Sequence, residues 1–359
     1  MRWNYSQNVF LRSIKNSLPP GAWVFCIMQP MQDAFSLLQT PKKIFLTTHH
    51  KPDGDALGSM LGMQLYLAKK GHLVTAVSPG EIPNFLEWMP GIPAMLNYEE
   101  HGDAARTALA EADIIMGLDF NDFSRTKYLD EILKSAPQPK ILIDHHLYPA
   151  DYWDYGWSIP SKSSTSEMVY DFITTAGDTS LIDLDIAACL YTGLLTDTGS
   201  FRFPVTSQSV HAMAGALIEL GLDHSAIFDA VYDSWSEARM RFLGYVLIER
   251  MEVFRKYSAA LIYLSRKDMN LFGVQSGDTE GIVNYPLSIA GIRFATLITE
   301  RSDEVKLSFR SKGNFDVSSF ARNYFEGGGH FNASGGRSKL ALQETIDYFK
   351  EILTKNHPE

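Results

Sequence analysis

Residues 43–79 read KIFLTTHHKPDGDALGSMLGMQLYLAKKGHLVTAVSP, and this stretch decides the fold. The apolar run KIFL predicts a strand, ALGSMLGMQLYLAKKG (56–71) predicts a helix that ends at its glycine, and HLVTAVSP (72–79) predicts a second strand. A strand, a crossover helix and a strand in this order form a βαβ unit, whose two strands lie parallel in one sheet.

Two later stretches extend this predicted sheet. ADIIMGLDF (112–120) and PKILIDHH (139–146) are short apolar runs without polar alternation. That pattern is typical of strands buried on both faces of a parallel sheet. Residues 164–196 and 207–253 read as helices, and the second of these segments carries more charge.

From residue 254 the pattern changes to the strands SAALIYLS, RFATLITE and EVKLSFRS, with a helix predicted for FDVSSFARNYF. We therefore predict an α/β protein: an N-terminal parallel-sheet domain with helices on both faces (34–206), a helical connector (207–253) and a smaller C-terminal α/β domain (254–359). Residues 1–33 are expected to be a poorly ordered extension.

Composition narrows the class of protein. The chain has 359 residues, a net charge of −10 and two cysteines, Cys26 and Cys189, both in apolar surroundings. We expect buried thiols and a cytoplasmic protein without a transmembrane helix, because no apolar run approaches the ~18 residues that a span needs. The acidic balance argues against tracking along long nucleic acids, but it leaves small phosphorylated ligands open.

Side chains of the type that binds metals follow several of the predicted strands. They are His49, Asp53, Asp55, Asp119, Asp144, His145, His146 and Asp197. Because the carboxyl ends of parallel strands face one crevice, these groups are expected to converge. Carboxylates mixed with imidazoles suit Mn²⁺, Fe²⁺ or Mg²⁺, and two such ions about 3.5 to 4 Å apart are typical of phosphoester hydrolysis.

The same residues also allow structural roles. A single Asp after a strand is commonly a helix cap, and Asp55 is a candidate for that role. Gly54, Gly58 and Gly62 do not form a dinucleotide-binding pattern, and no G-K-[ST] occurs in the chain. The spacing of Gly58 and Gly62 instead predicts close packing of their helix on the sheet.

The motifs HHKPDGDALGS, GLD, IDHH, TDTGSFRF and EGGGHFNASGG resemble, in this order, those of the DHH phosphoesterase superfamily. The likeness spans roughly residues 34 to 350 and is greatest to the two-domain nanoRNase and pAp phosphatase group, which has a DHHA1-type second domain. The resemblance implies two metal ions, typically Mn²⁺.

The resemblance also implies roles for individual residues. His49 and Asp53 would hold one metal ion, Asp55, His145 and Asp197 the other, and Asp119 would bridge them. His146 would face the substrate, and Asp144 would orient its neighbours as a catalytic support.

A second group of residues lies near the C-terminus. Gly327 to Gly329 lack side chains, so their backbone N–H groups can approach an anion, and His330 adds a donor. A phosphate cradle and a flexible turn are equally compatible with these residues alone. The resemblance favours the cradle and implies substrate binding by Arg310, Gly328, Gly329 and His330.

The function expected from the resemblance is hydrolysis of RNA oligonucleotides of 2 to 5 nucleotides to mononucleotides, of 3'-phosphoadenosine 5'-phosphate to AMP, or of both. The alternative is a phosphodiesterase for cyclic dinucleotides or linear pNpN. A catalytically inactive, nucleotide-binding regulatory protein is disfavoured because every implied metal ligand is present. The chain is also compatible with forming a homodimer.

Overall fold

A parallel sheet forms the first half of the molecule. The computed structural model describes residues 31–275 and 277–358. Its first sheet has the strand order β3-β2-β1-β4-β5-β6, and all neighbouring strands are parallel. The strands are β1 (Lys43–Thr47), β2 (Leu73–Ser78), β3 (Leu96–Asn97), β4 (Ile114–Leu118), β5 (Lys140–Asp144) and β6 (Tyr155–Ser158).

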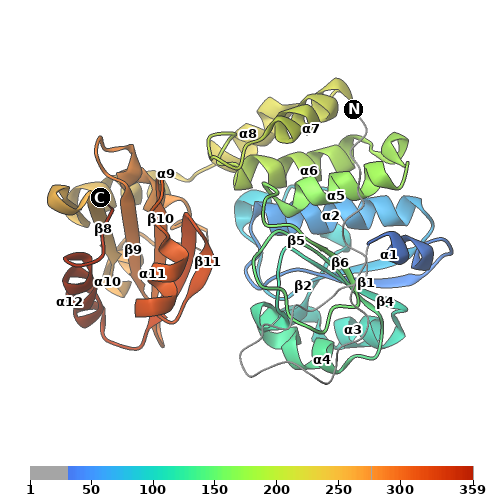
Figure 1. Ribbon diagram of the computed structural model, residues 1–359, viewed down its shortest axis with the longest axis horizontal. Helices are drawn as coiled ribbons and strands as arrows, with labels where there is room; N and C mark the ends of the chain where they lie inside the picture. Colours follow the sequence, from blue (N-terminus) through green and yellow to red (C-terminus); the bar gives the residue numbers. More distant parts are fainter. Residues whose placement is uncertain (1–30, 276, 359) are drawn as a thin grey trace, which may run out of the picture.

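Helices cover both faces of this sheet, which confirms the predicted fold class (Figure 1). One face carries α2 (Gly54–Lys69), α5 (Thr165–Thr175) and α6 (Leu184–Asp197), and the other carries α3 (Tyr98–Glu111) and α4 (Asp130–Ser135). Because successive side chains of a strand point to opposite faces, Ile44 and Leu46 enter one core and Phe45 enters the other. The strands are therefore buried on both sides.

The helix that follows β1 packs differently from the prediction. A Cβ added to Gly58 would lie 2.5 Å from the carbonyl oxygen of Cys189, and one added to Gly62 would lie 2.8 Å from the Leu190 side chain. Both glycines therefore allow close packing of α2 on α6 and not on the sheet, so the predicted partner was wrong. Cys189 is buried, as predicted, whereas Cys26 lies outside the described residues.

The first described helix overlaps the end of the segment that was predicted to be poorly ordered. Helix α1 (Met31–Leu37) starts inside the predicted extension, and Met31 and Ala34 are fully buried in the first core. Met31 to Asp33 therefore differ from the expectation of poor order. The rest of the predicted extension, residues 1–30, lies outside the described residues.

The predicted connector is helical, but its helices are shared between two cores. Helices α7 (Gln208–Glu219) and α8 (His224–Tyr232) contribute Val210, Leu217 and Val231 to the core of the first domain. Helix α9 (Glu237–Glu249) places Phe242 and Val246 against the second sheet. The chain thus passes from one domain to the other between α8 and α9 (Figure 1). The predicted boundaries at 34, 207 and 254 remain predictions.

The second domain is built on a mixed sheet with the order β11-β12-β10-β9-β8-β7, in which only β8 and β9 pair in parallel. Its elements are β7 (Met251–Phe254), β8 (Ala259–Leu264), α10 (Arg266–Leu271), β9 (Phe294–Glu300), β10 (Val305–Ser311), α11 (Val317–Tyr324), β11 (Gly328–His330), β12 (Ala333–Ser338) and α12 (Leu342–Leu353). The short 3-10 helices of the described chain are η1 (Asn84–Leu86), η2 (Ile92–Ala94), η3 (Phe123–Leu129), η4 (Thr179–Leu181), η5 (Arg255–Tyr257) and η6 (Ile282–Ser288).

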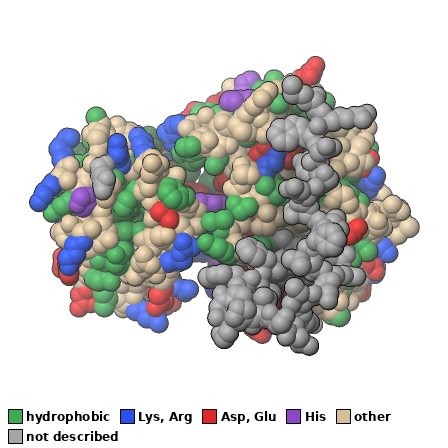
Figure 2. All heavy atoms as spheres, in the orientation of Figure 1, with side chains coloured by type: hydrophobic (Ala, Val, Ile, Leu, Met, Phe, Trp, Pro, Cys, Tyr) green, Lys and Arg blue, Asp and Glu red, His purple; other side chains and the backbone are tan. Residues whose placement is uncertain are grey.

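The two domains face each other across a hollow in the surface (Figure 2). The carboxyl ends of β1, β4 and β5 lie on the first domain's side of this hollow, because the ring of His330 from β11 contacts the rings that follow β5. Among the described residues, no helix has the length and apolar character needed to cross a bilayer.

Candidate metal centre

The structure brings together all of the residues that were predicted to bind metal. One group comprises His49, Asp53 and Asp119, and a second comprises Asp55, His145 and Asp197. Within each group the potential ligand atoms lie within 4.8 Å of one another. Two further sets meet the same distance, His145 with His146 and His330, and Asp119 with Asp144 and His146, so the division into two sites that the resemblance implied remains a proposal.

Asp119 lies between the two groups. Its Oδ2 is 3.6 Å from Nε2 of His49, and its Oδ1 is 3.4 Å from Nε2 of His145. Burial alone would raise the pKa of this carboxyl, but its contacts with His145 and His49 hold that pKa well below the ordinary value. The backbone of Asp119 has a φ of 66°, a left-handed conformation that side chains other than Gly rarely adopt and that clusters at functional sites.

The two histidines are oriented as metal ligands usually are. Nδ1 of His49 lies 3.1 Å from the carbonyl oxygen of His50, and Nδ1 of His145 lies 3.3 Å from that of Lys162. A carbonyl that accepts the Nδ1–H fixes the tautomer and leaves the lone pair on Nε2. In both residues Nε2 is the atom that faces the carboxylates.

Asp53, in the loop between β1 and α2, caps a helix and also faces a proposed metal ligand. Asp53, and not Asp55, is the N-cap of α2, because its Oδ1 accepts the backbone N–H groups of Asp55 and Ala56 at 3.1 Å. Its Oδ2 remains 4.0 Å from Nε2 of His49. The alternative in which Asp55 caps the helix is therefore wrong, because that residue lies inside the helix.

The sequence analysis missed the residues that hold Asp55. The N-terminus of α5 donates the backbone N–H of Thr165 to Oδ2 of Asp55 at 2.6 Å, and that of Ser166 to Oδ1 at 2.8 Å. The hydroxyl of Thr165 donates to Oδ1 of Asp119 at 2.9 Å. The N-terminus of α5 therefore holds the carboxylates of Asp55 and Asp119 in place. The motif STSE (164–167) has the S-x-x-E pattern of such a start, but it does not reveal what the helix points at.

The pKa shifts of the site residues indicate that the negative charge of the carboxylates is not fully balanced by side chains of the protein. Burial and the charge of Asp119 raise the pKa of Asp55 to about 7, and burial and Asp55 raise the pKa of Asp197 well above its ordinary value. Burial would lower the pKa of His145, but Asp119 and Asp197 raise it well above the ordinary value. Such a cluster requires bound protons or bound cations. Its donor set of imidazoles and carboxylates fits a pair of divalent cations.

His146 and Asp144 form a separate pair beside the metal ligands. Nδ1 of His146 is 2.7 Å from Oδ1 of Asp144, which is fully buried. The same histidine nitrogen is 3.8 Å from Oδ1 of Asp119. Because Asp144 engages Nδ1, Nε2 is the ring nitrogen left for the cleft.

The second domain contributes His330 to the same place. Its ring centroid lies 4.9 Å from that of His145 and 4.6 Å from that of His146. Burial and these two rings lower the pKa of His330 to about 3, so the ring is neutral at physiological pH. Arg310 on β10 donates to the carbonyl of Phe309, and the charges of Glu280, Asp197 and Asp53 act on its guanidinium.

Gly328 and Gly329 lie in strand β11, which Gly327 directly precedes, so these two glycines do not form a flexible turn. A Cβ on Gly327 would lie 2.1 Å from the Gly335 carbonyl oxygen, and Gly329 has a φ of 145°. These two positions are explained by the close approach of β11 and β12. A Cβ on Gly328 would meet only Cγ of Arg322, at 3.9 Å. Packing therefore does not explain why position 328 carries a glycine. The phosphate cradle remains a prediction.

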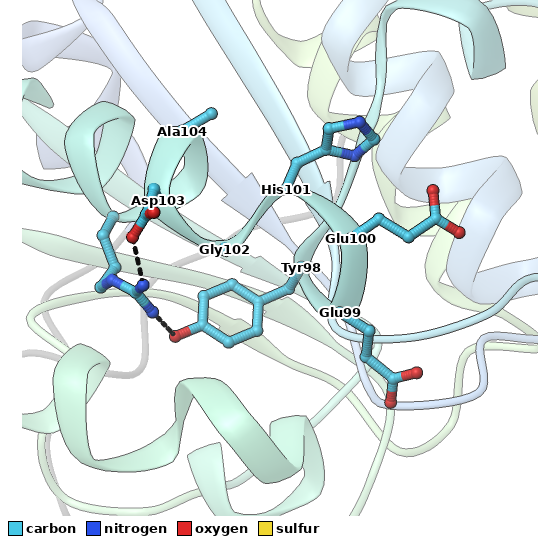
Figure 3. A pocket seen from close by; sticks show the side chains of 8 residues that line it. Tyr98, Glu99, Glu100, His101, Gly102, Asp103 and Ala104 are labelled. Atoms are coloured by element: carbon cyan, nitrogen blue, oxygen red, sulfur yellow. Dashed lines mark hydrogen bonds and ion pairs between the residues drawn. The ribbon is translucent and has the colours of Figure 1, made fainter.

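A second pocket, away from the cleft, is lined by acidic side chains that point in different directions (Figure 3). It lies where α3 bends at His101, and Figure 3 shows the side chains of Glu99 and Glu100 directed away from Asp103. Arg106 bonds to both Asp103 and the Tyr98 hydroxyl. In the described part of the chain, the groups of side chains able to hold a metal ion all lie at the cleft and none in this pocket.

Comparison with known proteins gives the family. Residues 43–194 match the DHH family, N-terminal domain, and residues 262–355 match the DHHA1 domain. The chain is 26% identical over 293 residues to the bifunctional oligoribonuclease and PAP phosphatase NrnA of Bacillus subtilis, covering 81% of this chain and 88% of that protein. It is 29% identical over 317 residues to the protein of the same name from Thermus thermophilus, covering 87% and 90%.

A solved structure agrees with this assignment. The exopolyphosphatase-related protein from Bacteroides fragilis superposes with a TM-score of 0.85 at 38% identity, over 90% of this chain and 95% of that one. Both domains and the intervening helices are therefore shared. The chain belongs to the DHH/DHHA1 family of phosphoesterases.

Proposed function

We propose that this protein hydrolyses RNA oligonucleotides of 2 to 5 nucleotides to nucleoside monophosphates, 3'-phosphoadenosine 5'-phosphate to AMP and phosphate, or both. The observation that carries the proposal is the placement of His330 from the second domain directly against His145 and His146 of the metal centre. A phosphate at the metal centre is thereby enclosed from two domains. The similarity to the two NrnA proteins supports the choice of substrate.

Each proposed ligand has a defined task. His49, Asp53 and Asp119 would hold one divalent cation, and Asp55, His145 and Asp197 the other, with Asp119 shared. Bound there, the two cations, proposed to be Mn²⁺ with Mg²⁺ or Fe²⁺ as alternatives, would supply Lewis-acid activation of water and charge stabilisation at phosphorus. The N-terminus of α5 keeps the Asp55 carboxylate in place through two backbone N–H groups.

His146 is proposed to act on the substrate. Asp144 accepts the Nδ1–H of His146 and so fixes the ring orientation and the tautomer. Nε2 is then available to the phosphate or to the oxygen that leaves. We therefore propose Asp144 as a positioning residue and His146 as the catalytic residue.

The second domain is proposed to bind the other end of the substrate. Arg310 offers a planar guanidinium that suits a phosphate, and Lys306 lies on the same strand. Burial lowers the pKa of Arg310, and the neighbouring charges of Glu280, Asp197 and Asp53 oppose this shift, which supports a position near the proposed metal ligands. Because two domains enclose the site, a short substrate with a terminal phosphate fits better than a long strand.

The test is chromatography of products after incubation with Mn²⁺ and pApA, 3'-phosphoadenosine 5'-phosphate or cyclic di-AMP in separate reactions. We expect mononucleotide from pApA and AMP from the bisphosphate, and no product with Asp119→Ala. Faster turnover of cyclic di-AMP would instead support the cyclic dinucleotide alternative. No metal-dependent turnover of any of the three would contradict the proposed substrates.

A further inference from the structure

One aromatic residue beside the metal centre has no role in packing. The segment LYPADYWDYGW (147–157) contains five aromatic residues. Trp153 is 3% exposed, the ring of Tyr152 stacks on Phe123 with centroids 4.5 Å apart, and Tyr155 and Trp157 pack on the first core. Tyr148, by contrast, is 70% exposed. Core packing therefore explains four of the five rings.

The backbone of Tyr148 is held in place although its ring is exposed. Its φ of 62° is in the left-handed region, which costs about 1–3 kcal/mol for a residue of this kind. The side-chain amide of Asn121 donates to the carbonyl oxygens of Leu147 at 2.6 Å and Tyr148 at 3.3 Å. The loop after β5 is thus fixed to the loop after β4. A large apolar ring presented to solvent by a fixed, strained backbone indicates a binding role.

The position of Tyr148 relates it to the proposed reaction. It follows His146 by two residues, so their Cα atoms lie within about 7 Å of each other. Across the cleft, the guanidinium carbon of Arg322 on α11 lies 5.9 Å from the centroid of the Tyr148 ring. Arg322 also runs beside Gly328, whose added Cβ would meet its Cγ at 3.9 Å. The ring and the guanidinium therefore lie together close to the segments that carry His146 and His330.

We propose that Tyr148 stacks on the nucleobase of the substrate and that Arg322 offers a second planar surface to the same base. This inference rests on the proposed function and adds to it the group that distinguishes a nucleotide from other phosphate esters. Aromatic and guanidinium planes are the surfaces on which unpaired bases stack, largely without regard to sequence. The separation of 5.9 Å is at the limit of a cation–π contact, so little interaction energy between Tyr148 and Arg322 is lost when a base binds.

The expected preference follows from this geometry. Ligands with a base bind more tightly than the same sugar phosphate without one. The difference is about 5- to 150-fold, because stacking on one aromatic ring is worth ~1–3 kcal/mol. Purines and pyrimidines are both accepted, since every base has a π face.

The experiment is isothermal titration calorimetry of the full chain with Mn²⁺, using AMP and, separately, ribose 5-phosphate. Tyr148→Ala is expected to weaken AMP binding about tenfold and to leave ribose 5-phosphate binding unchanged, whereas Tyr148→Phe behaves as the unaltered protein. Tyr348, which is 39% exposed on α12, provides the matched control Tyr348→Ala, with no expected change. In turnover of pApA, Tyr148→Ala is expected to raise KM more than it lowers kcat.

Three results would overturn the stacking role: AMP binding unchanged in Tyr148→Ala, equal weakening of both ligands, or no AMP binding by the unaltered protein. The binding measurement needs no turnover. Failure of the proposed reaction is therefore distinguishable, since it would appear as absent product beside Tyr148-dependent AMP binding.

Discussion

Buried carboxylates occur in both domains, but they are neutralised in different ways. In the second domain Asp268 accepts hydrogen bonds from Arg250 at 2.7 Å, from the Tyr245 hydroxyl at 2.6 Å and from the Ser265 hydroxyl at 2.7 Å. Its pKa lies well below the ordinary value: burial would raise it, but these partners outweigh burial. In the first domain Asp55 and Asp197 have raised pKa values because neighbouring carboxylates add to the effect of burial.

The difference separates a structural carboxylate from the proposed metal ligands. The chain itself supplies an arginine and two hydroxyl donors to Asp268, so this group stabilises the fold. Around Asp55, Asp119 and Asp197 it supplies histidines and the start of α5, but no Lys or Arg forms an ion pair with them among the described residues. The missing positive charge is what bound divalent cations would provide.

The largest expected effect is the loss of activity on replacing Asp119. Asp119→Asn removes the carboxylate shared by both proposed metal sites, and we expect hydrolysis of pApA to fall by more than about 10³-fold, equivalent to several kcal/mol of transition-state stabilisation. Thermal unfolding without metal should occur at a somewhat lower temperature, because the lowered pKa of Asp119 means that its charge stabilises the fold through His145 and His49, so activity is measured well below the melting transition. Activity within tenfold of the unaltered protein would show that Asp119 is not a shared ligand.

Replacing Asp268 should affect stability instead. Asp268→Asn breaks a buried pair with Arg250, and we expect a loss of about 3 kcal/mol in the free energy of unfolding with little change in activity below the melting transition. Because the native pKa of Asp268 is lowered, its stabilisation is present above the unfolded pKa of about 4 and is lost as pH falls. Urea unfolding at several pH values measures this. A stability difference that does not shrink below about pH 4 would contradict the role given to the ion pair.

The start of α5 offers a smaller and more selective test. Thr165→Val keeps the side-chain shape but removes the hydroxyl that donates to Asp119, so the apparent affinity for Mn²⁺ should fall about 10- to 100-fold. Thr174→Val on the same helix is the matched control, because its hydroxyl bonds only to the Asp171 carbonyl. Activity is titrated against Mn²⁺ for both variants. Equal affinities would mean that Thr165 does not position Asp119.

The smallest effect is expected at Gly328. Gly328→Ala adds a methyl group with room for it, so stability should be unchanged, while KM for pApA should rise about fivefold or less if the backbone contacts a phosphate there. Gly215→Ala on α7, where an added Cβ meets nothing within 4 Å, is the control. An unchanged KM would remove Gly328 from the substrate site.

The metal side of the cleft was predictable because its residues follow buried strands. The apolar runs before His49, Asp119 and His145 fix the strands, and the parallel arrangement brings their ends together. Local patterns do not reveal which helix meets which. Gly58 and Gly62 were therefore assigned to the sheet although they face α6, and Thr165 was missed although its helix was expected.

The substrate side was less predictable for the same reason. His330 and Arg310 were predicted to bind substrate because of the motif resemblance. The contact of His330 with His146, however, depends on how the two domains meet. Tyr148 could not be distinguished from its aromatic neighbours until their burial was known. Sequence patterns encode the period and the ends of elements, whereas exposure depends on contacts between distant parts of the chain.

The central claim is that the unneutralised carboxylates of the first domain hold two divalent cations. Anomalous diffraction at the manganese absorption edge, from crystals grown with Mn²⁺, tests it most directly. We predict two peaks, one contacted by His49 and Asp53 and the other by Asp55, His145 and Asp197, with Asp119 contacting both. No peak among these residues, or a single ion that leaves one group without metal, would contradict the account.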